Sequence, residues 1–224
     1  MRAMILAAGR GERLRPLTER VPKAMVPVGG KPLIAWHLER LAAAGCREAV
    51  VNVSHLAERI VEGLGDGARY GLRLSYSREA VPLETAGGIA QARALLGEAP
   101  FLLVNADVYC DIDFRPLLAT ALGARLVHLV LVANPAHRPE GDFSLEATGL
   151  VGNGAGARYT YAGIAVLSPA LVAPVRPGDR APLAPLLRAA AERGLATGAV
   201  HRGRWHDVGT AERLAELEAQ LGSK

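Results

Sequence analysis

A glycine-bearing loop near the N-terminus holds the residues best suited by type and spacing to chemistry. The apolar segment Met4–Leu6 leads into a loop with Gly9 and Gly11, and five cationic side chains follow: Arg10, Arg13, Arg15, Arg20 and Lys23. Glycine has no Cβ, so the backbone can come close to a ligand and turn its N–H groups toward anionic oxygens, while cations offset the remaining charge. The sequence therefore predicts a loop that holds a triphosphate.

Two better-known phosphate loops do not fit these residues. A dinucleotide-binding turn needs a third small residue where Leu14 stands, and a P-loop needs a Gly-Lys-Ser/Thr triplet that this loop lacks. A plainer interpretation is a tight turn with solvated arginines around it. That interpretation leaves the Pro22–Lys23 pair unexplained, so we favour the phosphate loop.

Two aspartates are candidates for holding the metal ion that a bound triphosphate requires. Asp107 follows the apolar segment 101–105, and Asp207 lies in the turn 204–209. Mg²⁺ prefers one or two carboxylates together with phosphate oxygens and water. Either aspartate alone is as readily a helix cap or a turn residue. Together with the glycine loop, they predict a Mg²⁺ site.

Composition places the chain among α/β proteins and excludes some partners. It has 224 residues, half of them hydrophobic, which suits one domain with a sizeable core. The net charge of +4 brings nucleic acid into consideration, but no aromatic residue interleaves with the basic segment as a base-stacking surface would require. No leader or membrane-length apolar segment occurs, and Cys46 and Cys110 have no metal-ligand spacing. We expect a cytoplasmic protein with reduced core thiols that binds neither nucleic acid nor membrane.

Strand and helix patterns alternate along the first part of the chain. The apolar patterns predict strands over 2–6, 48–53, 72–76, 101–105 and 126–132, and helices over 31–44, 54–64 and 85–96. Gly45 is expected to end the first helix, and Ser54 and Thr85 to cap the next two. The continuous apolar segment 101–105 is typical of a central parallel strand whose carboxyl end opens onto a site.

The regularity changes after Asn134. Two strand-like segments, 143–151 and 158–167, follow one another without a helix between them, which predicts an antiparallel extension. Helices are expected over 181–193 and 210–221, with a short strand and the turn 204–209 between them. The leucine stripe of the last helix is more typical of packing within the chain than of a dimer.

Five motifs in this order resemble the sugar-1-phosphate nucleotidylyltransferases. They are Leu6–Thr18, Pro22–Val28, Glu84–Gly88, Asn105–Asp107 and Trp205–Thr210. Segments 128–135, 141–143, 163–171 and 202–205 most resemble the branch that transfers a uridylyl group from UTP to N-acetylmuramate α-1-phosphate in peptidoglycan recycling. The resemblance implies a Rossmann-like three-layer nucleotidyltransferase fold (GT-A-like) with a mixed, mostly parallel sheet. It also implies one domain, 1–224, with a nucleotide-binding portion over about 1–134 and a sugar-binding portion over about 135–224.

The family's reaction, if it holds here, assigns roles to named residues. The sugar phosphate would attack the α-phosphorus of the nucleoside triphosphate in line, pyrophosphate would leave, and Arg13 and Lys23 would be catalytic. The resemblance assigns the nucleotide to Leu6, Ala7, Gly9, Gly11, Glu12, Arg13, Lys23, Pro82 and Gly88, the sugar phosphate to Asn105, Gly141, Asn153, Tyr161 and Arg202, and Mg²⁺ to Asp107 and Asp207. Gly87 and Gly88 are also compatible with close helix packing, Asn153 with a turn, and Lys23 with a solvated surface.

One family feature is missing. Many relatives carry a Glu-Lys-Pro segment whose lysine holds the sugar phosphate, whereas Glu146 here has no lysine after it. Arg202 or Arg204 is the candidate replacement, although either is equally compatible with a surface arginine. Other substrates remain open: mannose 1-phosphate with GTP, or glucose 1-phosphate with dTTP or UTP. So does a catalytically silent nucleotide-sensing module.

Overall fold

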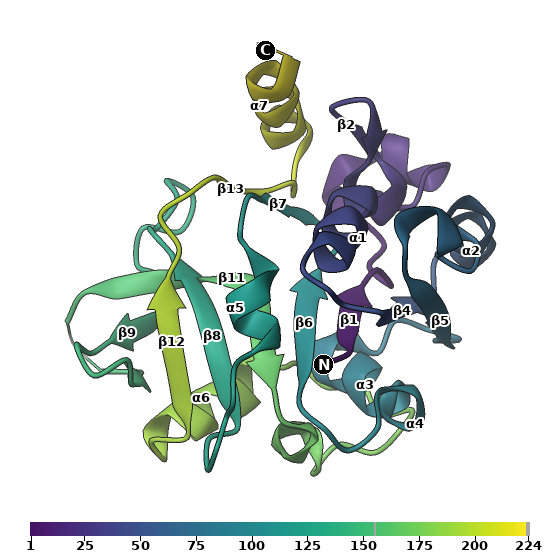
Figure 1. Ribbon diagram of the computed structural model, residues 1–224. Coiled ribbons are helices and arrows are strands. Elements are labelled where there is room, and N and C mark those ends of the chain that lie inside the picture. Colours follow the sequence, from purple (N-terminus) through teal and green to yellow (C-terminus); the bar gives the residue numbers. More distant parts are fainter. Residues whose placement is uncertain (155, 223–224) are drawn as a thin grey trace.

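A nine-stranded sheet runs through the molecule in a computed structural model that describes residues 1–154 and 156–222. Its strands are β1 (Ala3–Leu6), β4 (Glu48–Val53), β5 (Arg73–Arg78), β6 (Phe101–Asn105), β8 (Val127–Val132), β9 (Phe143–Leu145), β10 (Val151–Gly152), β11 (Arg158–Leu167) and β12 (Ala196–Val200). The order is β10-β9-β11-β6-β1-β4-β5, and β8 pairs with β11 and β12 (Figure 1). Strands β6, β1, β4 and β5 are parallel, whereas β11 runs antiparallel to β6, β8 and β9. The sheet is mixed, with a parallel centre, as predicted.

Helices cover both faces of the sheet. The first face packs against α1 (Leu33–Ala43), α2 (Ala57–Leu64) and α5 (Phe114–Leu118), and the second against α3 (Glu84–Gln91), α4 (Arg93–Leu96) and α6 (Ala184–Glu192). Because successive side chains of a strand point to opposite faces, Ile5 joins the first core and Met4 the second. Both side chains are fully buried. The arrangement confirms the predicted three-layer α/β class.

A smaller layer lies beyond the carboxyl ends of the parallel strands. It contains the hairpin of β2 (Pro27–Val28) with β3 (Lys31–Pro32), and β7 (Val108–Cys110) paired with β13 (Trp205–Asp207). Helix α7 (Ala211–Gly222) packs on this layer: Leu217 lies in a core with Val28 and Leu33, against which Leu214 and Leu221 also pack. Packing of the leucine stripe within the chain is confirmed.

None of the five predicted helix starts is exact. Helix α1 begins at Leu33 rather than at 31, because Lys31 and Pro32 form β3, and α7 begins at Ala211 rather than at 210. The other three starts differ for reasons in the backbone. Helix α2 begins at Ala57 because Leu56 adopts a left-handed conformation, and no side chain caps that helix. Helix α3 begins at Glu84, which makes Thr85 part of the first turn, and Ala92 separates α3 from α4. Helix α6 begins at Ala184 rather than at 181, because Ala181 exchanges backbone hydrogen bonds with the start of α3.

The predicted strand 143–151 is a hairpin. Gly149, at φ +82, turns the chain between β9 and β10, and the Glu146 amide donates to the Leu150 carbonyl across the turn. The two cysteines are free and buried, as expected of core thiols. Among the helices of the described residues, none combines the length and apolar character needed to cross a membrane.

His37 gives the fold a pH-dependent weakness. The ring is fully buried, and Nε2 lies 2.6 Å from the Val108 carbonyl oxygen. Burial lowers the pKa of His37 from 6.5 to about 4. The unfolded chain therefore takes up a proton on this ring as the pH falls through 6.5, while the folded chain does so only near 4.

We expect wild type to lose about 3 kcal/mol more stability than His37→Gln between pH 7 and pH 4, as the linkage relation gives for a shift of this size. Urea unfolding of both proteins at pH 7, 5 and 4 measures the difference. A parallel decline of the two proteins would show that His37 does not titrate as its burial requires.

Candidate active site

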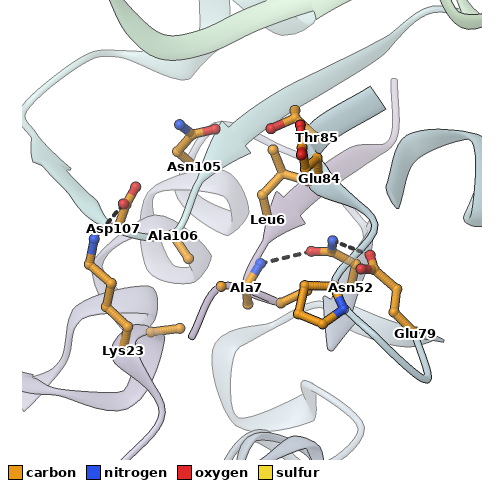
Figure 2. Close-up of a pocket in the computed structure, with 14 residues that line it drawn as sticks. Leu6, Ala7, Lys23, Asn52, Glu79, Glu84, Thr85, Asn105, Ala106 and Asp107 are labelled. Atoms are coloured by element: carbon orange, nitrogen blue, oxygen red, sulfur yellow. Dashed lines mark hydrogen bonds and ion pairs between the residues drawn. The ribbon is translucent and has the colours of Figure 1, made fainter. Parts of the chain in front are cut away.

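Three connected cavities lie at the carboxyl ends of the parallel strands. The central cavity, of about 210 Å³, is lined by residues from the ends of β1, β4 and β6, including Leu6, Asn52 and Asn105 (Figure 2). It is smaller than the roughly 300–1,000 Å³ of typical ligand sites. It shares Gly9, Lys23, Pro82 and Asp107 with a second cavity, and Glu84, Thr85 and Asn105 with a third. We call these the loop cavity, of about 710 Å³, and the outer cavity, of about 570 Å³.

The glycine loop is held in shape by its own hydrogen bonds. Its backbone makes short turns at Glu12–Leu14, Leu17–Glu19 and Lys23–Met25. The Thr18 hydroxyl donates to the Gly11 carbonyl at 2.7 Å, and the Leu14 amide donates to the same carbonyl at 2.9 Å. The buried Leu14 side chain anchors the turn, while Gly9, Gly11, Glu12 and Arg13 line the loop cavity. These predicted phosphate-loop residues therefore share one cavity.

Gly11 is required by both its conformation and its surroundings. Its φ is +64°, and a Cβ would lie 2.8 Å from the Thr18 methyl carbon. We expect Gly11→Ala to lower the free energy of unfolding by about 3 kcal/mol, from the left-handed backbone and the clash together. Gly30→Ala is the matched control, because Gly30 has φ +81° but open space around it. Its expected loss, from the backbone alone, is about 1 kcal/mol. Equal losses in urea unfolding would contradict this account.

Lys23 and Asp107 form an ion pair where the central and loop cavities meet. The Lys23 ammonium lies 2.6 Å from Asp107 Oδ2, and the Lys23 side chain is only 12% exposed (Figure 2). Lys23 comes from the end of the glycine loop and Asp107 from the turn after β6, so two distant segments meet at one point. A cation and a carboxylate are thus concentrated beside both cavities.

Strand pairing places Asp207 next to Asp107. In the β7–β13 pair Asp207 lies opposite Val108, and the Val208 amide donates to the Asp107 carbonyl at 2.9 Å. Asp207 Oδ2 accepts a hydrogen bond from Arg213 at 2.9 Å and lies 3.6 Å from His137 Nε2. Asp107, in the turn before β7, and Asp207, in β13, offer two carboxylates of the kind that Mg²⁺ prefers, provided that phosphate oxygens and water complete its shell. Asp107 lines the central and loop cavities, whereas Asp207 lines none of the three. No group of three or more His, Cys, Asp and Glu side chains suited to a metal occurs in residues 1–154 and 156–222.

A buried polar relay fixes the floor of the central cavity. Asn52 Oδ1 accepts from the Ala7 amide at 2.8 Å, and its Nδ2 donates to Glu79 at 2.6 Å (Figure 2). Glu79 in turn accepts from the Leu83 amide at 2.9 Å. A Cβ on Gly88 would lie 2.7 Å from Glu79, so Gly88 permits this packing and does not line the cavity. The relay connects the phosphate loop to the segment that carries Pro82.

Arg180 brings a further positive charge to the loop cavity from a segment far along the chain. The Arg180 guanidinium pairs with Glu84 at 2.9 Å, and Arg180 lines the loop cavity. Glu84 has φ +61°, which is uncommon for a residue other than glycine and is often found at ligand sites. A Cβ on Gly87 would lie 2.2 Å from the Asp179 carbonyl oxygen, so only glycine lets the two segments come this close. Sequence reasoning missed both Glu84 as a lining residue and Arg180.

The residues predicted to bind the sugar are only partly brought together. Asn105 and Tyr161 line the outer cavity. Gly141 lines a separate hollow over 137–142, the Asn153 amide donates to the Arg188 carbonyl at 2.9 Å, and Arg202 is exposed and outside the three cavities. The arginines that do line the outer cavity are Arg138 and Arg188.

Comparison with known proteins agrees with this geometry. Residues 2–145 match the family described as Nucleotidyl transferase. An N-acetylmuramate alpha-1-phosphate uridylyltransferase of Neisseria meningitidis serogroup B is 48% identical over 233 residues, covering 100% of this chain and 99% of that protein. A mannose-1-phosphate guanylyltransferase catalytic subunit beta of Drosophila melanogaster is 42% identical over 120 residues, covering 52% of this chain and 32% of that protein.

The solved structures give the same fold. A Bacillus anthracis protein in complex with sucrose superposes with a TM-score of 0.86 at 19% identity, covering 100% of this chain and 96% of that one. The chain therefore belongs to the nucleotidyl transferase family, and it is an enzyme of that class.

Proposed function

We propose that this protein transfers the uridylyl group of UTP to N-acetylmuramate α-1-phosphate, which gives UDP-N-acetylmuramate and pyrophosphate. The similarity to the Neisseria uridylyltransferase over nearly the whole of both chains carries the choice of substrates. The similarity to the guanylyltransferase covers about half of this chain and favours that alternative less. The silent-module alternative has no support from a chain that keeps Arg13, Lys23, Asp107 and Asp207.

Each of the three cavities is assigned one part of the substrates. The uracil lies in the central cavity between Ala7 and Pro82, and the triphosphate lies in the loop cavity along Gly9–Arg13. The sugar lies in the outer cavity beside Asn105 and Tyr161. With these placements the α-phosphorus and the sugar phosphate meet where the central and loop cavities join, next to Lys23 and Asp107.

The chemistry needs positioning and charge stabilisation more than proton transfer. A sugar phosphate with a second pKa near 6 is mostly dianionic at neutral pH, so its oxygen attacks the α-phosphorus without a general base. The bond to the bridging oxygen breaks on the opposite side, and pyrophosphate leaves with that electron pair. The Lys23 ammonium stabilises the charge on the α-phosphate oxygens, and Arg13 and Arg180 stabilise the leaving pyrophosphate.

Mg²⁺ is the cofactor in this proposal. Asp107 and Asp207 would hold the ion, which screens the repulsion between the two phosphates when it is bound. Because Asp107 also pairs with Lys23, and Asp207 with Arg213, the two cations hold the carboxylates in place before substrates arrive. We place the protein in the cytoplasm, where UTP is available, and its reaction in the recycling of peptidoglycan.

A substrate matrix tests the proposal. Pyrophosphate release in Mg²⁺ is measured with UTP, GTP, dTTP, CTP and ATP against N-acetylmuramate, N-acetylglucosamine, glucose and mannose 1-phosphates. We expect the highest kcat/KM for UTP with N-acetylmuramate 1-phosphate. Another preferred pair would reassign the substrates, and no turnover with any pair would favour the silent nucleotide-sensing module.

A further inference from the structure

The outer cavity carries a cation that the transfer step does not use. Four of its lining residues have ionisable acidic or basic side chains: Glu84, Arg138, Asp142 and Arg188. Glu84 pairs with Arg180 at 2.9 Å, and Asp142 pairs with Arg138 at 3.5 Å. Within residues 1–154 and 156–222, the Arg188 guanidinium has neither an ion pair nor a hydrogen bond. Its charge is therefore available to a ligand.

Arg188 lies in the part of the outer cavity that is not shared with the central cavity. Asn105 and Thr85 line both the central and the outer cavity. Arg188 comes from α6, close to Leu187, and lines the outer cavity but not the other two. The Asn153 amide donates to the Arg188 carbonyl at 2.9 Å and to Glu192 at 3.3 Å. These bonds fix the backbone of α6 at Arg188 and leave the side chain free.

Tyr161, which also lines the outer cavity, has a buried hydroxyl without a partner. Tyr161 Oη is inaccessible to solvent and makes no hydrogen bond in the described part of the chain. Buried polar groups are nearly always hydrogen-bonded, and burial raises the pKa of Tyr161, so the hydroxyl stays protonated and able to donate. Because Tyr161 Oη is inaccessible, the exposed and unpaired Arg188 guanidinium is what suits the cavity to an anionic ligand.

We propose that Arg188 binds the lactyl carboxylate of N-acetylmuramate 1-phosphate and so selects this sugar over N-acetylglucosamine 1-phosphate. The inference rests on the proposed function. With the 1-phosphate at Lys23 and Asp107, the sugar ring extends past Asn105 into the outer cavity, and the proposal places its lactyl ether at the part of the cavity that Arg188 lines. A guanidinium matches a carboxylate in two parallel hydrogen bonds, which a neutral hydroxyl cannot reproduce.

The test is a ratio of specificities. We expect Arg188→Gln to lower the kcat/KM ratio of N-acetylmuramate over N-acetylglucosamine 1-phosphate about 10-fold, as loss of a charge-assisted hydrogen bond predicts. Arg188→Lys should restore part of the ratio. Arg193→Gln is the matched control, since Arg193 is exposed just after α6 and lines none of the three cavities.

A neutral substrate analogue separates recognition from a structural effect. In the lactyl amide of N-acetylmuramate 1-phosphate the carboxylate is replaced, so wild type and Arg188→Gln should use the amide within about twofold of each other, by the additivity logic of a double-mutant cycle. A 10-fold loss with the amide as well would overturn the proposal, because the variant would then act through the fold of the cavity.

The wild-type ratio distinguishes failure of this inference from failure of the proposed function. If wild type does not prefer N-acetylmuramate 1-phosphate, the proposed substrate is wrong. If wild type prefers it and Arg188→Gln keeps the same preference, the substrate is right and Arg188 does not bind the lactyl carboxylate. Arg138→Gln, measured in parallel, shows whether the other arginine of the cavity carries the selection instead.

Discussion

Replacing Lys23 by methionine should lower kcat for sugar-nucleotide formation by about 10²- to 10³-fold, the usual cost of removing a preorganised stabilising group. In the proposed reaction Lys23 supplies positive charge beside the α-phosphate and the sugar phosphate, and its side chain is only 12% exposed. Methionine keeps the length and apolar volume of the side chain but not the charge. Initial rates with saturating UTP and sugar phosphate measure the effect on kcat.

The fold should tolerate this change. Asp107 is 36% exposed, so water can solvate the carboxylate that Lys23 leaves unpaired. Lys31→Met is the control: Lys31 pairs with Glu39 and lies 3.7 Å over the Trp36 ring, outside the three cavities. A Lys23→Met enzyme with kcat within threefold of the Lys31→Met enzyme would contradict the assignment of Lys23.

Asp107→Asn should remove most of the Mg²⁺-dependent turnover, with kcat falling about 10²-fold or more because a neutral amide is a poor ligand for a hard cation. Asp207→Asn should act in the same direction. Asp113→Asn is the matched control, since Asp113 is exposed, pairs with Arg115 and lies outside the three cavities. Rates over a Mg²⁺ titration distinguish a weakened metal site from a general loss of activity.

A binding measurement tests the same site without turnover. Two carboxylates alone make a weak Mg²⁺ site, so Mn²⁺ should bind tightly only with a non-hydrolysable UTP analogue that adds phosphate oxygens. Electron paramagnetic resonance of free Mn²⁺ should show this binding in wild type and its loss in Asp107→Asn. Unchanged Mn²⁺ affinity in the variant would exclude Asp107 as a ligand.

The strands and layers were predictable because apolar periodicity reports burial directly. Strand β6 is continuously apolar over 101–104 and lies at the centre of the sheet, between β1 and β11. Helix starts were less predictable, since α2 and α3 begin without a side-chain cap. The turn at Gly149 was missed because a strand pattern continues through it.

Some residues of the site were likewise predictable from the sequence, and others were not. The glycine loop, Lys23 and Asp107 could be proposed from the sequence because contiguous motifs carry them, and they line the cavities. Asn52 offered one signal, a polar residue near the end of β4 that follows the apolar stretch 49–51. Glu79, Arg180 and Arg188 offered none, since each reaches its cavity only through contacts between segments far apart in the sequence. The choice of Arg202 followed from its closeness to Asp207 in the chain, whereas packing of α6 brings Arg188 to the outer cavity.

The most direct test of uridylyl transfer follows phosphorus itself. Wild type is incubated with UTP, Mg²⁺ and N-acetylmuramate α-1-phosphate, and ³¹P nuclear magnetic resonance records all products over time. We predict that the sugar phosphate is converted to a nucleoside diphosphate sugar and that pyrophosphate appears in equal amount. Release of UMP and pyrophosphate with the sugar phosphate unconsumed would show hydrolysis instead of transfer and would contradict the proposed reaction.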